Sequence, residues 1–175
     1  MRQRNHWTRI LFILYLYTLV KIILFKFQDP AMPYLLERIK TDLTSPDLVL
    51  YRMQQGNLIP LGEITRTLQN VSGHGLLNLF GNIGLFIPFG IFLGLLGVEK
   101  RISMGRVLLT VFAASLCLES AQAVLSIGCF DVDDLILNSL GGLIGFAGFQ
   151  LCVKWKQDSV PIRRSKEGNT RLTRV

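Results

Sequence analysis

Carboxylate and amide side chains interrupt stretches of this chain that are otherwise apolar. The residues are Asn78, Asn82, Glu119, Gln122, Asp131, Asp134 and Asn138. A carboxylate can transfer a proton or coordinate a cation, and an amide can donate and accept hydrogen bonds. A carboxylate at the centre of a membrane costs about 2.5–3.5 kcal/mol on insertion scales. Each of these side chains therefore needs a structural or a functional explanation.

Four members of this set, which lie well inside the predicted helices, are expected at similar depths in the membrane. With a rise of about 1.5 Å per residue, they lie about 6 to 12 Å from the outer ends of their apolar stretches. In order of increasing depth they are Asn138, Gln122, Asn82 and Glu119. Side chains from three helices are therefore predicted to share one layer near the outer side of the membrane.

The spacing of the polar residues also places them on single helix faces. His74, Asn78 and Asn82 recur every fourth residue, and Glu119 and Gln122 are three residues apart. On the last predicted helix, one stripe contains Asp131, Asp134, Asn138, Gly141 and Gly145. Asp133 falls off this stripe. We expect the polar faces to point into a helix bundle and to line a pocket that opens outward.

A structural interpretation competes with the pocket. Asp131 or Asp133 can cap the last helix, which is worth about 0.5–2 kcal/mol, and the other carboxylates can complement its dipole. Capping does not explain the residues that lie within helices, namely Asn82, Glu119, Gln122 and Asn138. For those residues the alternative to a pocket is a hydrogen-bond network that only holds the helices together.

Metal and catalytic patterns are weak in this chain. The string "DVDDLILN" departs from a calcium-binding loop because Leu135 and Ile136 stand where an oxygen ligand and glycine are needed. A divalent cation held by Asp131, Asp134 and Glu119 is an alternative, and otherwise no cofactor is expected. No nucleophile-elbow serine is present, and the Asp131–Asp134 pair lacks the glycine and arginine of lipid-head-group transferases. The sequence thus favours a protein that is not an enzyme.

Four apolar stretches must position these groups. Half of the residues are hydrophobic and only 18% are charged, and a helix that crosses a membrane needs about 20 mostly apolar residues. The stretches are Ile10–Phe27, Leu76–Gly97, Val107–Ile127 and Leu135–Val153. They predict an all-α fold, a bundle of four transmembrane helices. Pro88 is expected to kink the second helix, and small-xxx-small glycine pairs predict close packing of the second helix on the fourth.

The net charge of +7 comes mostly from residues beside the apolar stretches. This placement sets membrane topology and gives no reason to expect nucleic acid as a partner. We expect a multi-pass protein of the cell membrane with both termini in the cytoplasm, a transmembrane domain over residues 1–153 and a basic cytoplasmic tail over 154–175. The long Gln28–Gly75 loop would then be extracytoplasmic. Within it, "NLIPLGEITRTLQN" predicts a short amphipathic helix on the membrane surface.

Several of these segments resemble the VanZ-like family of bacterial membrane proteins. The segments are "GNLIPL" from Gly56, "NLFGNIGLFIPFG" from Asn78, "LCLESAQAVLSIG" from Leu116 and "FDVDDLILNSLGGLIGF" from Phe130. The resemblance covers roughly residues 10–150. It implies a role in the cell envelope, because the founding member is associated with low-level resistance to the glycopeptide teicoplanin. It also adds Asn57 to the residues expected to bind a ligand and draws attention to Pro60.

The expected function is binding of an amphiphile, such as a lipid-linked cell-wall component or a lipoglycopeptide, or of a membrane lipid. An acidic pocket disfavours a bare phosphate, so the bound group would be cationic, a sugar hydroxyl or a phosphate bridged by a metal ion. Two alternatives are an intramembrane enzyme that uses Glu119 and Asp134 on lipid-linked components and a small proton-coupled transporter that uses Glu119. A transporter would need a homo-oligomer, because four helices are few.

Overall fold

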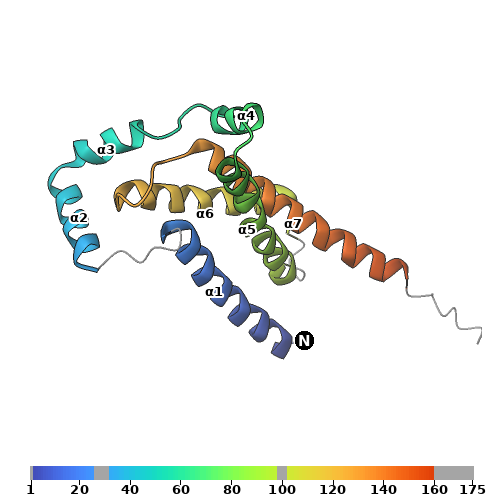
Figure 1. Cartoon of the computed structure of the whole chain (residues 1–175). Coiled ribbons are helices and arrows are strands. Elements are labelled where there is room, and N and C mark those ends of the chain that lie inside the picture. The colour runs from blue at the N-terminus through green and yellow to red at the C-terminus, as the bar shows by residue number, and fades with distance from the viewer. Residues whose placement is uncertain (1, 26–31, 98–101, 160–175) are drawn as a thin grey trace, which may run out of the picture.

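The computed structural model of the protein describes residues 2–25, 32–97 and 102–159. Within these residues the chain is all-helical and has no strand. The helices are α1 (Arg2–Phe25), α2 (Met32–Thr44), α3 (Pro46–Gln54), α4 (Gly62–Gln69), α5 (Gly73–Gly97), α6 (Met104–Val124) and α7 (Val132–Asp158). Figure 1 shows α5 and α7 crossing at the centre, with α2, α3 and α4 following one another around one end.

Four of these helices, α1, α5, α6 and α7, are long and apolar enough to cross a membrane. They coincide with the four predicted stretches, so the all-α prediction is confirmed and each predicted span is a helix of sufficient length and apolarity. The bounds differ at their ends. The helix α5 begins at Gly73, and α6 ends at Val124. The helix α7 continues past residue 153 to Asp158, so the expected domain boundary falls inside a helix, and residues 160–175 of the tail lie outside the described part.

The segment between the first two spans differs from the expected long loop, because its described residues form three helices. Pro46 stands at the start of α3, where its fixed backbone angle favours a helix and its missing N–H is not needed. An ion pair of 2.8 Å between Arg52 and Asp42 joins α3 to α2. The helix α4 matches the short amphipathic helix predicted from "NLIPLGEITRTLQN", whereas its contact with a membrane surface stays a prediction.

Glycines allow α5 and α7 to pack backbone against backbone, and this pair has the most extensive contact in the bundle. A Cβ atom on Gly141 would overlap the carbonyl oxygen of Ile83, and one on Gly145 would overlap that of Ile87. Gly90 of α5 approaches the α7 backbone equally closely. The predicted close packing of these two spans is therefore confirmed.

The remaining core joins α1 and α6 to this central pair. Its fully buried side chains are Leu19, Phe86, Val107, Val111 and Phe146. The hydroxyl of Tyr15 in α1 donates a hydrogen bond to the carbonyl of Leu85 in α5. Pro88 lies three residues further on, within α5, where it has no N–H to offer the preceding turn. The carbonyl that loses its helical donor to Pro88 is that of Gly84, one residue before the acceptor of the Tyr15 hydroxyl.

Candidate functional site

The N-terminus of α7 is capped by Asp131. Its backbone is extended, and its carboxylate accepts a hydrogen bond of 2.8 Å from the N–H of Asp133. Asp133 and Asp134 lie in the first turn, where negative charge interacts favourably with the helix dipole. Of the two candidate caps considered from the sequence, Asp131 is the one that caps this helix.

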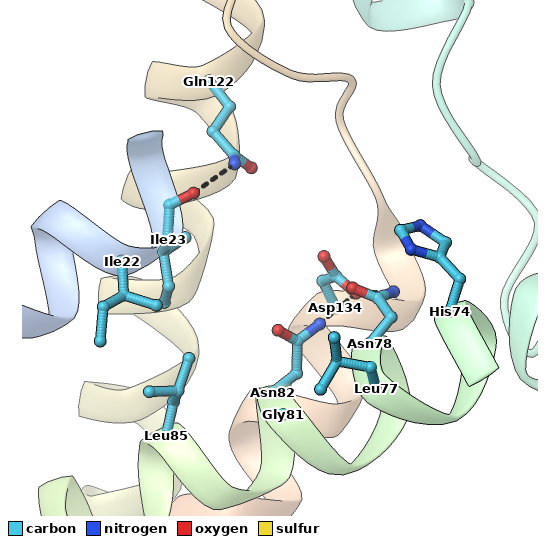
Figure 2. A pocket seen from close by; sticks show the side chains of 10 residues that line it. All are labelled: Ile22, Ile23, His74, Leu77, Asn78, Gly81, Asn82, Leu85, Gln122 and Asp134. Carbon is cyan, nitrogen blue, oxygen red and sulfur yellow. Dashed lines mark hydrogen bonds between the residues drawn. The ribbon is translucent and has the colours of Figure 1, made fainter. Parts of the chain in front are cut away.

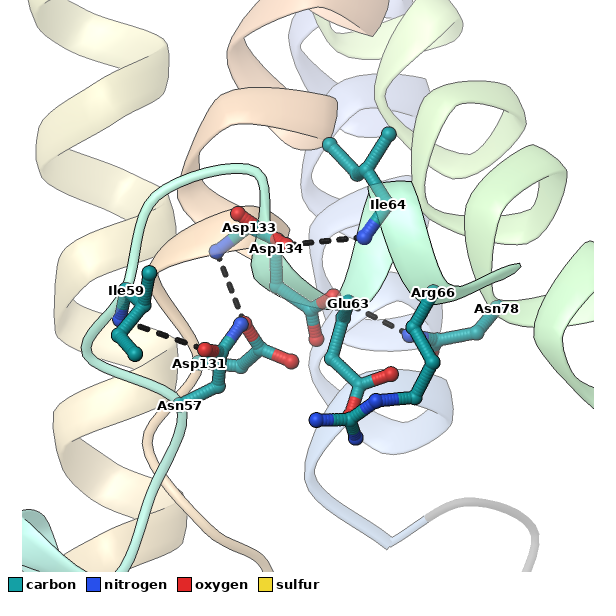
Figure 3. Close-up of polar contacts among 9 residues, drawn as sticks. All are labelled: Asn57, Ile59, Glu63, Ile64, Arg66, Asn78, Asp131, Asp133 and Asp134. Atoms are coloured by element: carbon teal, nitrogen blue, oxygen red, sulfur yellow. Dashed lines mark hydrogen bonds and ion pairs between the residues drawn. The ribbon is translucent and has the colours of Figure 1, made fainter. Parts of the chain in front are cut away.

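The segment that begins at Gly56 lies directly against this N-terminus, as Figure 3 shows. The side-chain amide of Asn57 donates to the Asp131 carboxylate at 2.9 Å, and the Asn57 carbonyl accepts from the N–H of Val132 at 2.9 Å. A Cβ atom on Gly56 would overlap the carbonyl oxygen of Phe130. Glycine at position 56 therefore permits the close approach of these two chain segments, and the hydrogen bonds of Asn57 hold them together.

Asp133 holds the start of α4. Only 1% of its surface is exposed, and its two carboxylate oxygens accept hydrogen bonds from the N–H groups of Leu61 and Ile64. Leu61 has a left-handed backbone with φ of 66°, which costs a residue other than glycine about 1–2 kcal/mol. The bonds to Asp133 offset this cost and supply two of the N–H partners that the first turn of α4 lacks.

Glu119 belongs to the same assembly. It is 1% exposed, and one of its carboxylate oxygens accepts a hydrogen bond of 3.2 Å from the backbone N–H of Asp131. Asn57, Glu119, Asp131 and Asp133 therefore form one group, here called the Asp131 cluster. It ties α6, the N-terminus of α7 and the start of α4 together. The contacts assign it a positioning role at the end of the bundle.

A cavity of about 410 Å³ lies beside this cluster and is lined by residues of α1, α5, α6 and α7. We call it the Asp134 cavity. Its walls are made by Ile22, Ile23, His74, Leu77, Asn78, Gly81, Asn82, Leu85, Gln122 and Asp134. Figure 2 shows Asn78, Asn82 and Asp134 grouped on one side, with His74 beside them. The cavity thus combines an acidic, amide-rich side with aliphatic walls.

The polar side of the Asp134 cavity is organised by hydrogen bonds. One Asp134 carboxylate oxygen accepts from the amide of Asn82, and the amide of Asn78 lies 3.4 Å from the same oxygen. These two amides sit one turn apart on α5, as the spacing of the sequence predicts. The arrangement fixes a carboxylate at the cavity wall, where it can accept a hydrogen bond from a ligand that carries an N–H or O–H group.

Gln122 closes the cavity on the side of α1. It is buried, and its amide donates a hydrogen bond of 2.8 Å to the carbonyl of Ile23. Ile23 lies in the last turn of α1, where carbonyl groups have no partner within the helix. Gln122 therefore lines the cavity and also satisfies the end of the neighbouring helix.

Asn138 lies away from the cavity, between α6 and α7. It is buried and donates a hydrogen bond of 2.8 Å to the hydroxyl of Ser115. The Asn138 Oδ1 and Ser139 Oγ atoms are buried and have no hydrogen-bond partner among the described residues. The Asn138–Ser115 bond joins α7 to α6, and Asn138 is not among the residues that line the Asp134 cavity.

The predicted single pocket is therefore divided in the structure. Asn78, Asn82, Gln122 and Asp134 share the cavity. Asn57 bonds to the Asp131 carboxylate and Glu119 accepts from the Asp131 N–H, whereas Asn138 pairs with Ser115. Sequence reasoning missed the anchoring role of Asp133 and the pairing of Ser115. Ser115 lies four residues before Glu119 on the same face of α6, which was an available signal. Nothing in the sequence indicates that the backbone carbonyl of Ile23 accepts a hydrogen bond from Gln122.

The described carboxylates are not grouped as ligands of a divalent cation. Within residues 2–25, 32–97 and 102–159, no group of three His, Cys, Asp or Glu side chains is arranged to hold a metal ion. Asp131, Asp134 and Glu119, the three carboxylates considered for this role, are thus not such a group. The carboxylates are instead engaged with amide and backbone N–H groups.

Two comparisons with known proteins point to the same family. A family model described as VanZ/LLP1 matches residues 12–153. The chain is also 28% identical over 148 residues to a protein named Protein VanZ from Enterococcus faecium, an alignment that covers 84% of this chain and 76% of the relative. No solved structure matches the chain significantly.

Proposed function

Because the chain belongs to the VanZ/LLP1 family, we propose that it is a multi-pass protein of the bacterial cell membrane that binds an amphiphilic ligand in the Asp134 cavity. Through this binding it contributes to tolerance of teicoplanin-type glycopeptides, which is the role that the family resemblance implies. The ligand is a membrane lipid, a lipid-linked cell-wall component or the lipid-bearing part of a lipoglycopeptide. No chemical step is part of this proposal.

The Asp134 cavity is the observation that carries the proposal. Its volume of about 410 Å³ lies within the range of small-molecule sites, about 300–1,000 Å³. This volume suits a head group with a segment of an acyl chain. Aliphatic side chains such as Ile22, Leu77 and Leu85 would contact the chain, while Asp134 with its two amide partners would contact the head group.

The charge of the cavity restricts the head group. Asp134 disfavours a phosphate placed directly against it, since like charges in a region of low dielectric repel strongly. An ammonium group or a sugar hydroxyl can donate to the carboxylate instead, and the carbonyl oxygens of Asn78 and Asn82 can accept further hydrogen bonds. We therefore expect a ligand whose head group presents N–H or O–H donors.

We infer from the distribution of basic residues that the cavity lies in the outer leaflet. Several basic residues lie toward the helix ends that are remote from Asp134. They are Arg9 in the first half of α1, Arg106 at the start of α6, and Lys154 and Lys156 at the end of α7. Residues 125–137 carry no Lys or Arg. By the positive-inside rule the basic ends face the cytoplasm, so both termini are cytoplasmic and α4 is extracytoplasmic.

The experiment compares ligand retention by the purified protein and two variants. Mass spectrometry after gentle extraction should detect a bound amphiphile with the unmodified chain and about tenfold less with Asp134→Asn, because hydrogen bonds to a charged group are worth about 1.5–3 kcal/mol. Asp158→Asn removes an exposed carboxylate at the far end of α7 and should retain the ligand. Equal retention by both variants would contradict the proposal, and turnover of the amphiphile would replace it with an enzyme.

A further inference from the structure

A second cavity lies at the opposite end of the α5–α7 pair. Its volume is about 350 Å³, and residues near the end of α5 and in the second half of α7 line it. Gly94 follows Asn78 by sixteen residues of α5, which corresponds to about 24 Å of helix. The hydrocarbon region is about 30 Å thick. The two cavities therefore lie near opposite surfaces of the membrane.

The lining of the second cavity changes from apolar to polar along one face of α7. Phe146 and Phe149 lie toward the membrane interior, and Gln150, Lys154 and Gln157 follow on the same face at spacings of three and four residues. On the α5 side the wall is formed by Gly94 and Gly97, with Phe149 packed directly on Gly94 and Ile102 directly on Gly97. The result is a hollow with aromatic walls inside and amide and ammonium groups at its mouth.

The charge of this cavity is opposite to that of the Asp134 cavity. Among the described residues that line it, Lys154 has the one charged side chain and no carboxylate is present. The aliphatic stem of a lysine can lie along apolar surface while its ammonium group stays at the interface. Basic pockets between transmembrane helices near the cytoplasmic surface suit anionic head groups.

We propose that the second cavity holds an anionic phospholipid of the leaflet opposite the Asp134 cavity. The phosphate accepts hydrogen bonds from Lys154 and from the amides of Gln150 and Gln157, and an acyl chain lies against Phe149. Since the lipid contacts α7 beside Gly94 and Gly97, it fills the space between the ends of α5 and α7. It thereby stabilises the folded bundle by mass action.

The test counts phospholipids retained by the full-length protein in native mass spectrometry. The protein is taken from nanodiscs of phosphatidylcholine alone or mixed with phosphatidylglycerol. We expect preferential retention of phosphatidylglycerol and a loss of about tenfold with Lys154→Gln, because the charge-assisted hydrogen bond from Lys154 to the phosphate is removed. Lys156→Gln is the matched control, because it removes the same charge from an exposed position of α7 that does not line the cavity.

Two further comparisons keep the test specific. Gln150→Glu places a carboxylate in the cavity and should also lower retention of phosphatidylglycerol. Thermal unfolding gives a second readout, since phosphatidylglycerol should raise the melting temperature of the unmodified chain more than that of Lys154→Gln. Equal losses with Lys154→Gln and Lys156→Gln, or no preference for phosphatidylglycerol over phosphatidylcholine, would overturn the proposal.

Discussion

The side-chain amide of Asn57 donates a hydrogen bond of 2.9 Å to the carboxylate of Asp131, which lies 74 residues further along the chain. This contact brings the "GNLIPL" segment onto the "FDVDD" segment at the start of α7. Two segments that carry the family resemblance are thus neighbours in space. The part of the chain between the first two spans is therefore attached to the bundle beside the Asp134 cavity.

Removal of the Asp133 carboxylate should release the start of α4. With Asp133→Ala, the N–H groups of Leu61 and Ile64 lose their acceptor. Hydrogen bonds to a charged group are worth about 1.5–3 kcal/mol. Hydrogen exchange at these two amides should accelerate by about tenfold or more, and Asp133→Asn, which keeps one acceptor oxygen, should have a smaller effect.

The control for this prediction is Glu63→Gln. It breaks only the ion pair between Glu63 and Arg66 within α4, and exposed pairs of this kind contribute little. Hydrogen exchange at Leu61 and Ile64 should stay near that of the unmodified chain. If Asp133→Ala left both amides as protected as this control does, the anchoring role of Asp133 would be wrong.

The packing of α5 on α7 should not tolerate a methyl group at Gly145. Such a methyl would overlap the Ile87 carbonyl oxygen, and overpacking typically costs about 1–3 kcal/mol. Gly148→Ala is the matched substitution on the same helix, because no atom lies within 4 Å of the added carbon. Unfolding by denaturing detergent should show a loss of stability for Gly145→Ala and none for Gly148→Ala. Equal stability of the two variants would contradict the close packing.

The bond between Asn138 and Ser115 should contribute modestly to stability. Hydrogen bonds between membrane helices average about 0.6 kcal/mol and reach about 1.7 kcal/mol in double-mutant cycles. We expect a coupling energy in this range when Asn138→Leu and Ser115→Ala are measured singly and together. A coupling energy of zero would show that the contact of 2.8 Å adds nothing to folding.

The sequence predicts the spans well because membrane helices must be long and apolar, and the ends of α5, α6 and α7 fall within a few residues of the expected positions. The glycine stripe of α7 also predicts the tight contact with α5. In both cases a local pattern determines the result. The helices α2 and α3 are harder to predict, because they depend on contacts such as that of Arg52 with Asp42.

The candidate site is predictable only in part. Helix periodicity correctly gives the shared face of Asn78 and Asn82, and the depth estimate places Gln122 in the same layer. Periodicity does not say which side chains will bond to each other. Glu119 accepts a hydrogen bond from the backbone N–H of Asp131, and Asn138 donates one to Ser115. In each case the partner belongs to the neighbouring helix or its N-cap. Such pairings follow from tertiary packing, which the sequence pattern does not specify.

The most direct test of a ligand in the Asp134 cavity is to fill the cavity without changing its polar groups. Gly81 lines the cavity and Gly84 does not, and a side-chain carbon added at either position meets no atom within 4 Å. The measurement is teicoplanin tolerance of a susceptible bacterium that produces each variant at equal levels in its membrane. We predict that Gly81→Phe abolishes the tolerance given by the unmodified protein and that Gly84→Phe preserves it. Full tolerance with Gly81→Phe would contradict the account.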